Sequence, residues 1–218
     1  MNNLSKRILT SLILLLTIYF SLLNFILFSI CLICLNFFIL IEFNFLYRKI
    51  FKYKNLYYFF SFLITFIYII FFSSIIWKYL FSNFETSINL IIFLITICSS
   101  TDIGGFLFGK LIGGKKLTKV SPNKTYAGVI GSFILPLLLG LLYLDIYNDR
   151  VIEDVNNILL IIVISFFSQL GDLIISFFKR KAKVKDTGRI LPGHGGILDR
   201  ADGILLAVPI AILIIYMY

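Results

Sequence analysis

Most of the sequence consists of apolar runs that are long enough to cross a lipid bilayer. These runs cover residues 8–41, 56–77, 88–108, 126–144, 158–178 and 204–218. About 20 apolar residues span the ~30 Å hydrocarbon core as a helix. Only 14% of the 218 residues are charged, whereas about 25% is usual in a soluble domain. The pattern excludes a soluble globular domain and predicts an all-α, polytopic helical membrane protein.

The first apolar run is too long for one span and suits two short ones. A hairpin near Ser21 to Asn24 would divide it, which predicts about seven transmembrane spans. Lys6 and Arg7 precede the run as they would in a signal peptide, but no small-residue cleavage site follows them. We therefore expect this segment to be retained.

The basic residues predict the orientation of these spans. With the hairpin, 18 of the 20 Lys and Arg fall on the side of the N-terminus, and only Lys78 and Arg150 fall on the other. Because such residues concentrate in cytoplasmic loops, the N-terminus and loops 109–125 and 179–202 should be cytoplasmic and the C-terminus external. The net charge of +9 is thereby assigned to orientation, and no nucleic acid partner is expected.

Polar chemistry is concentrated in the second half of the chain. We therefore divide it into N-terminal transmembrane helices, residues 1–100, and a C-terminal transmembrane catalytic region, residues 101–218. Anchoring to anionic lipid would need only cations, yet Asp186, Asp199 and Asp202 alternate with Lys and Arg in the second loop. Oxygen ligands of this kind suit a hard divalent cation, so the loop is a candidate Mg²⁺-phosphate site.

Two further features place carboxylates near this loop. Asp172 lies inside an apolar run, where an ionisable residue is costly and indicates function by default; capping a helix break or pairing with a lysine is the structural alternative. Asp199 and Asp202 are three residues apart at the start of the last span. They would share a helix face where the dipole favours anions, although capping could explain one of them.

Glycines surround the only histidine, His194, in the run Leu191-Pro-Gly-His-Gly-Gly196. Glycine backbone can approach a ligand closely, and its N–H groups can turn toward phosphate oxygens. We interpret His194 as a donor facing a ligand. A flexible hinge is the alternative interpretation of the glycines.

The first cytoplasmic loop ends in Ser121-Pro-Asn-Lys124-Thr-Tyr, a turn followed by a helix start. Hydroxyls and a lysine at a helix N-terminus suit a phosphate, although the same residues also form ordinary turns. Upstream, Asp102 is a costly carboxylate within a span. The glycines that follow it are more typical of helix packing than of ligand binding.

Residues 176–202 resemble the signature of the phosphatidate cytidylyltransferases, also called CDP-diacylglycerol synthases. That signature combines Ser-x-x-Lys-Arg, Lys-Asp-x-Gly, Leu-Pro-Gly-His-Gly-Gly and Asp-Arg-x-Asp, and every spacing is kept here. The matching residues are Ser176, Lys179, Arg180, Lys185, Asp186, Gly188, Leu191 to Gly196, Asp199, Arg200 and Asp202. Tyr126 and Ala127 replace the family's usual Trp-Glu, and Ala201 replaces a larger apolar residue. The chain is short for the family, so we expect one or more N-terminal spans to be missing.

The resemblance implies that phosphatidate attacks the α-phosphorus of CTP, giving CDP-diacylglycerol and pyrophosphate at the cytoplasmic face of the cell (inner) membrane. It implies Mg²⁺ held by Asp172 and Asp199, with K⁺ as a further ion that the family allows, and it allows a homodimer. Lys179, Arg180, Lys185 and Arg200 would neutralise phosphates, Ser121 and Lys124 would contact phosphate, and Asp102, Asp186, His194 and Asp202 would belong to the site without assigned roles.

Two alternatives stay open at this point. A CTP-dependent lipid kinase, or a cytidylyltransferase for another lipid phosphate, would keep the fold and change the acceptor, because apolar surfaces select acyl chains weakly. An ion-coupled transporter would use the intramembrane carboxylates as an ion path and would not turn over CTP.

Overall fold

The computed structural model describes residues 3–51, 55–82, 84–116, 124–147, 156–193 and 195–217. Within these ranges the chain forms seven α-helices and no strand, apart from two isolated bridges, so the all-α prediction is confirmed. The helices are α1 (Asn3–Leu22), α2 (Phe25–Ile50), α3 (Leu56–Ser82), α4 (Phe84–Leu111), α5 (Tyr126–Tyr147), α6 (Asn157–Lys181) and α7 (Leu198–Met217).

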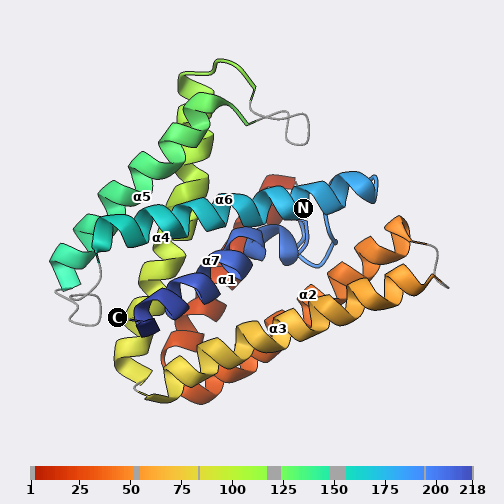
Figure 1. Ribbon diagram of the computed structural model, residues 1–218, viewed down its shortest axis with the longest axis horizontal. Coiled ribbons are helices and arrows are strands. Elements are labelled where there is room, and N and C mark those ends of the chain that lie inside the picture. The colour runs from red at the N-terminus through yellow and green to blue at the C-terminus, as the bar shows by residue number, and fades with distance from the viewer. Residues whose placement is uncertain are drawn as a thin grey trace. The chain divides into compact units, whose positions relative to one another are not determined.

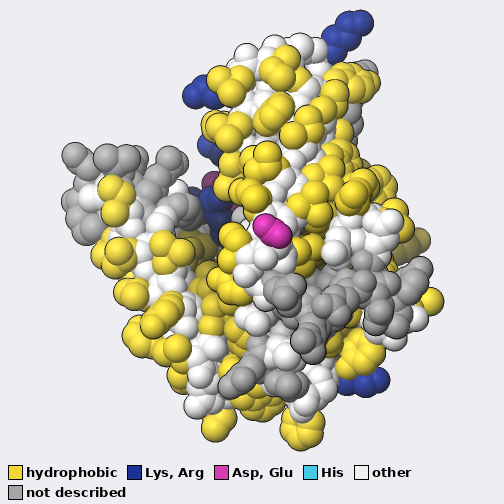
Figure 2. Space-filling model, turned by 90° about the vertical axis from the view of Figure 1, so that its left-hand side faces the viewer, with side chains coloured by type: hydrophobic (Ala, Val, Ile, Leu, Met, Phe, Trp, Pro, Cys, Tyr) yellow, Lys and Arg dark blue, Asp and Glu magenta, His cyan; other side chains and the backbone are white. Residues whose placement is uncertain are grey.

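Six of the described helices, α2 to α7, are long and apolar enough to cross a membrane, and α1 adds a shorter apolar stretch, Ile8–Leu22. Many large hydrophobic side chains on these helices are exposed, and hydrophobic atoms cover much of the described surface in Figure 2. Lipid tails can cover such a surface, and helices satisfy their own backbone hydrogen bonds there. The chain is a multi-pass membrane protein with about seven spans.

The predicted hairpin in the first apolar run is confirmed. The first helix ends at Leu22 and the second begins at Phe25. Between them Asn24 has an extended backbone, and its side-chain oxygen accepts a hydrogen bond from the Ile26 N–H at 2.8 Å. Asn is a strongly preferred N-cap because it satisfies one of the unpaired N–H groups at a helix start.

The chain divides into two compact units, one formed by residues 1–80 and 177–201 and the other by residues 81–176 and 202–218. We describe each by itself. In the first unit α2 and α3 run side by side in opposite directions (Figure 1). Their contact includes hydrogen bonds from Asn36 to Ser73 at 2.6 Å and between the hydroxyls of Tyr47 and Thr65 at 2.7 Å. Buried polar groups that are paired in this way fix the register of two otherwise apolar helices.

The end of α6 belongs to the same unit and packs on α2. The Phe178 ring meets Phe43 and Tyr47 edge-on, with ring centroids 6.4 and 5.7 Å apart. Edge-to-face geometry at such distances is favourable for aromatic pairs. This contact places the segment after α6 beside the polar end of α2.

In the second unit, glycines bring α4 and α5 together. A Cβ at Gly128 would lie 2.7 Å from the carbonyl oxygen of Gly105, and one at Gly131 would overlap the Phe108 side chain. Small residues at helix contacts let backbones approach closely in a membrane. The expectation that the glycines after Asp102 serve helix packing is confirmed.

This contact predicts opposite outcomes for two helical glycines. Gly131→Ala should lower the free energy of unfolding by about 1–3 kcal/mol, because overpacking forces neighbouring groups apart. Gly105→Ala is the matched control: its Cβ would meet Ser132 Cβ at an ordinary 3.6 Å, and alanine is the better helix former. Thermal unfolding in detergent measures both. A Gly131→Ala protein as stable as the Gly105→Ala protein would contradict the assigned contact.

Candidate functional site

The segment between α6 and α7 is folded into a defined loop. Lys183 adopts a left-handed backbone with φ 54°, just after the helix ends, and Gly193 and Gly195 have φ of 82° and 85°. Leu191 and Gly195 exchange backbone hydrogen bonds of 3.0 and 3.1 Å. Glycine adopts positive φ without the steric cost that a Cβ brings. In its described residues the loop is therefore a hydrogen-bonded turn, which does not favour the hinge alternative.

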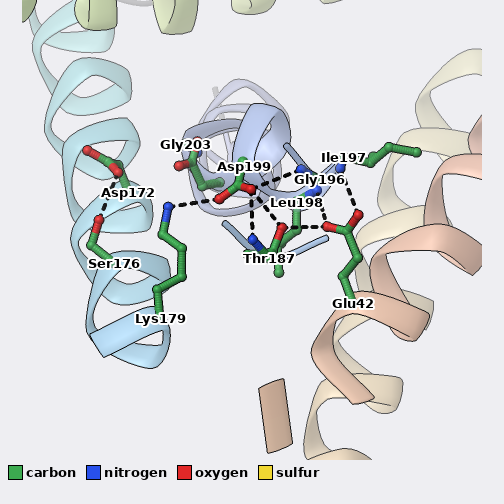
Figure 3. Close-up of polar contacts among 11 residues, drawn as sticks. Glu42, Asp172, Ser176, Lys179, Thr187, Gly196, Ile197, Leu198, Asp199 and Gly203 are labelled. Atoms are coloured by element: carbon green, nitrogen blue, oxygen red, sulfur yellow. Dashed lines mark hydrogen bonds and ion pairs between the residues drawn. The ribbon is translucent and has the colours of Figure 1, made fainter. Parts of the chain in front are cut away.

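Asp199, in the first turn of α7, organises this loop (Figure 3). Its Oδ1 accepts a hydrogen bond from Lys179 Nζ at 2.8 Å, in an ion pair that is mostly buried. Its Oδ2 accepts from the backbone N–H groups of Thr187 at 2.8 Å and Gly196 at 3.0 Å. The carboxylate thus ties the end of α6, the middle of the loop and the start of α7 together.

A second carboxylate, Glu42 of α2, contacts the start of α7 (Figure 3). It is 1% exposed. Its two oxygens accept hydrogen bonds from the Ile197 N–H at 2.9 Å and the Leu198 N–H at 2.8 Å. The first N–H groups of a helix have no partner within the helix, and the dipole there favours an anion. Glu42 therefore caps α7 from another helix.

The Thr187 hydroxyl lies between the two carboxylates. Its Oγ1 is 2.6 Å from Glu42 Oε2 and 3.0 Å from Asp199 Oδ2. A hydroxyl has one hydrogen to donate, so Thr187 can donate to only one of the two carboxylates at a time. The shorter distance favours Glu42 as the acceptor. Thr187 is fully buried and links the carboxylate network of α2 to that of α7.

The described loop glycines make room for these carboxylates. A Cβ at Gly188 would lie 2.6 Å from Glu42 Oε1, and one at Gly195 would lie 2.9 Å from Asp199 Oδ2. A Cβ at Gly196 would overlap both Thr187 and Glu42. The close approach that glycine permits is therefore used here by the protein's own acidic side chains.

Glu42 was missed in the sequence because it directly follows the first apolar run, where a charged residue is ordinary. In the structure α2 continues to Ile50, so Glu42 lies within a 26-residue helix. An ionisable residue inside a span indicates function by default. Extending the helix to the basic residues Arg48 and Lys49 would have exposed this signal.

In the second unit, Asp172 pairs with a lysine of the first cytoplasmic loop. Its Oδ2 forms an ion pair with Lys124, and its Oδ1 accepts a hydrogen bond from Ser176 at 3.2 Å. The adjacent Gly171 lets the backbone of α7 approach α6, since a Cβ there would overlap the Asp202 carbonyl oxygen. Pairing with a lysine is the structural alternative for Asp172, and this contact supports that alternative.

The remaining candidate residues vary in exposure. Asp202 is 9% exposed, and its Oδ1 accepts from the Gly203 N–H at 2.9 Å. The Thr125 hydroxyl accepts from the Gly128 N–H at 3.1 Å and so caps α5. Ser121 and His194 lie outside the described residues. Asp102, Arg180, Lys185, Asp186 and Arg200 are exposed.

The donor chemistry of Asp172 and Asp199 fits a divalent cation. Among the described residues no group of three or more His, Cys, Asp or Glu is placed to hold a metal. Each of these two carboxylates nevertheless directs one oxygen at a lysine ammonium, Lys124 or Lys179. Carboxylate oxygens are the protein ligands that Mg²⁺ uses, usually one or two of them together with water and substrate phosphates. The ligand chemistry of each carboxylate is therefore compatible with Mg²⁺, and the lysine pair is the contact that such an ion would replace.

Comparison with known proteins decides the family. The model of the cytidylyltransferase family matches residues 2–218. The chain belongs to the cytidylyltransferase family. Among its relatives, the phosphatidate cytidylyltransferase of Staphylococcus saprophyticus is 43% identical over 133 residues, which are 61% of this chain and 51% of the relative. That of Staphylococcus aureus strain COL is 46% identical over 128 residues, 56% of this chain and 47% of the relative.

This cytidylyltransferase-family chain spans about half the length of the curated relatives it matches. The family assignment agrees with the resemblance found in residues 176–202.

Proposed function

We propose that the chain is a phosphatidate cytidylyltransferase, which converts CTP and phosphatidate to CDP-diacylglycerol and pyrophosphate. The observation that carries the proposal is the family match over residues 2–218, which includes the cation-rich segment organised by Asp199. Relatives that are 41–46% identical bear this name. The activity and both substrates are proposals for this chain.

The proposed reaction forms one bond and breaks one bond. A phosphate oxygen of phosphatidate bonds to the α-phosphorus of CTP, and the bond from that phosphorus to the bridging oxygen of the β-phosphate breaks. Pyrophosphate leaves with the electron pair. A phosphate monoester is already anionic near neutral pH, so the reaction needs no strong general base.

The main barrier is the approach of two polyanions, and the chain's cations are suited to lower it. Lys179, Arg180, Lys185 and Arg200 would neutralise phosphate charge and align the nucleophile with the leaving group. Lys179 is at present paired with Asp199 at 2.8 Å. A phosphate group would compete with that carboxylate for the ammonium group. Ser121 and Lys124 stay predictions as phosphate contacts, and Asp102, Asp186, His194 and Asp202 stay in the proposed site without assigned roles.

Asp172 and Asp199 stay predictions as the Mg²⁺ ligands, with K⁺ as a further candidate ion. When bound, Mg²⁺ would neutralise negative charge on the phosphate groups of CTP. Each carboxylate is paired with a lysine, Lys124 or Lys179, which a bound cation would have to displace. The cell membrane, the cytoplasmic face of the site and a homodimer are further predictions.

The proposal predicts Mg²⁺-dependent formation of CDP-diacylglycerol. Purified protein in detergent micelles, given CTP and phosphatidate, should release one pyrophosphate for each CDP-diacylglycerol that mass spectrometry detects. Chelation with EDTA should abolish both products, and added Mg²⁺ should restore them. Product formation no faster than in protein-free micelles, with protein shown to be folded, would refute the proposed activity.

A further inference from the structure

A pocket of about 590 Å³ lies in the first unit between α2 and the segment that follows α6. Ile41, Phe45 and Lys49 line it from α2, and Lys185, Arg189 and Ile190 line it from the opposite side. Pockets of roughly 300–1,000 Å³ are typical of small-molecule sites. This one has room for a lipid headgroup and the first part of its chains.

The α2 wall changes from apolar to cationic along the helix. Ile41, Phe45 and Lys49 are four residues apart and therefore share one face. Ile41 is 44% and Phe45 39% exposed, and Lys49 lies in the last helical turn. The Lys49 ammonium stands 4.7 Å over the Phe45 ring, a favourable cation–π distance. An amphiphile with an anionic head matches this order.

Positive charge exceeds accessible negative charge in the pocket. Lys185 and Arg189 are exposed, like Lys49, and provide two more cations. Glu42 also lines the pocket, but it is 1% exposed and its oxygens accept hydrogen bonds from Thr187 and the start of α7. Asp186 is then the one exposed carboxylate among the lining residues. Three exposed cations and one exposed carboxylate would face a ligand, and this balance suits a phosphomonoester, which carries nearly two negative charges near neutral pH.

We propose that this pocket binds the phosphomonoester headgroup of the acceptor lipid, a step that rests on the function proposed above. Lys49 and Arg189, which the signature residues do not include, hold the phosphate together with Lys185. Ile41, Phe45 and Ile190 contact the first carbons of the acyl chains. A nucleotide would use the cations but would gain little from the apolar wall, so the lipid is the better occupant.

The test measures binding separately from turnover. Titration calorimetry of the purified full chain in detergent would use dioctanoyl phosphatidate, inorganic phosphate and CTP in turn, without Mg²⁺. The double variant Lys49→Gln/Arg189→Gln should bind dioctanoyl phosphatidate at least about tenfold more weakly, because charge-assisted hydrogen bonds are lost, and should bind CTP unchanged. Both side chains are exposed, so the variant should fold, and thermal unfolding checks this.

Lys181→Gln is the matched control. Lys181 also lies in the last turn of a helix and stands 4.7 Å over the ring of Phe177, but it does not line the pocket. The Lys181→Gln protein should bind phosphatidate with the affinity of the wild type. The proposal is overturned if the double variant keeps wild-type affinity for phosphatidate, or if its affinity for CTP falls by the same factor. It is also overturned if inorganic phosphate binds to the wild type as tightly as dioctanoyl phosphatidate does. If the wild type binds phosphatidate, the double variant binds it more weakly, and the wild type does not turn over CTP, then the proposed function is refuted and the proposed lipid site is kept.

Discussion

Replacing Glu42 with leucine is expected to lower the free energy of unfolding by about 3 kcal/mol or more. The substitution removes the acceptor for the N–H groups of Ile197 and Leu198 and leaves the Thr187 hydroxyl with Asp199 as its acceptor. A buried donor left without a partner costs about 1–3 kcal/mol. The start of α7 and the loop should also shift, so CDP-diacylglycerol formation should fall together with stability. Denaturation in detergent and a turnover assay measure the two effects.

Glu42→Gln provides the graded control. Its amide oxygen can still accept, but its NH₂ group must replace one carboxylate oxygen and face a donor. The loss of stability should therefore lie between those of wild type and the leucine variant. A leucine variant as stable as wild type would show that the Glu42 contacts contribute nothing to the fold.

Replacing Asp199 with asparagine is expected to lower kcat/KM for CTP by about 100-fold or more. The asparagine oxygen can keep the hydrogen bonds from Thr187 and Gly196, but its NH₂ group would face the Lys179 ammonium in place of the negative charge. Thermal unfolding checks that the variant stays folded. Stabilisation of charge by a bound metal is worth several kcal/mol, and each 1.36 kcal/mol is tenfold in rate. Initial rates measured over a range of Mg²⁺ concentrations test the effect.

Asp145→Asn is the control for that substitution. Asp145 is an exposed carboxylate on α5 to which no role is assigned, so the same chemical change there should leave kcat/KM unaltered. An Asp199→Asn protein with wild-type kcat/KM and an unchanged Mg²⁺ dependence would remove Asp199 from the metal site and leave it as an organiser of the loop.

The membrane spans could be predicted from the sequence because segment length and hydropathy determine them almost alone. The first apolar run is too long for one crossing, and Asn24 provides a cap at the break. The glycines after Asp102 were also interpreted correctly as packing residues. These features depend on local sequence, so a single chain is enough to reveal them.

The carboxylate network could not be predicted because its partners are distant in sequence. Glu42 and Thr187 are 145 residues apart, and no local pattern connects them. The sequence places Lys179 and Asp199 in one polar segment, and they were assigned separately to phosphate and to metal. The structure pairs them with each other at 2.8 Å, a contact that depends on how the loop between α6 and α7 folds.

We propose that the chain transfers a cytidylyl group to a lipid phosphate. The most direct measurement supplies phosphatidate with CTP that carries a radioactive label on either its α- or its γ-phosphate, and follows the label into extracted lipid. Cytidylyl transfer predicts that the α-label enters the lipid and the γ-label leaves in pyrophosphate. Appearance of the γ-label in lipid would show a CTP-dependent kinase instead. A lipid fraction that stays unlabelled with both forms of labelled CTP would contradict cytidylyl transfer.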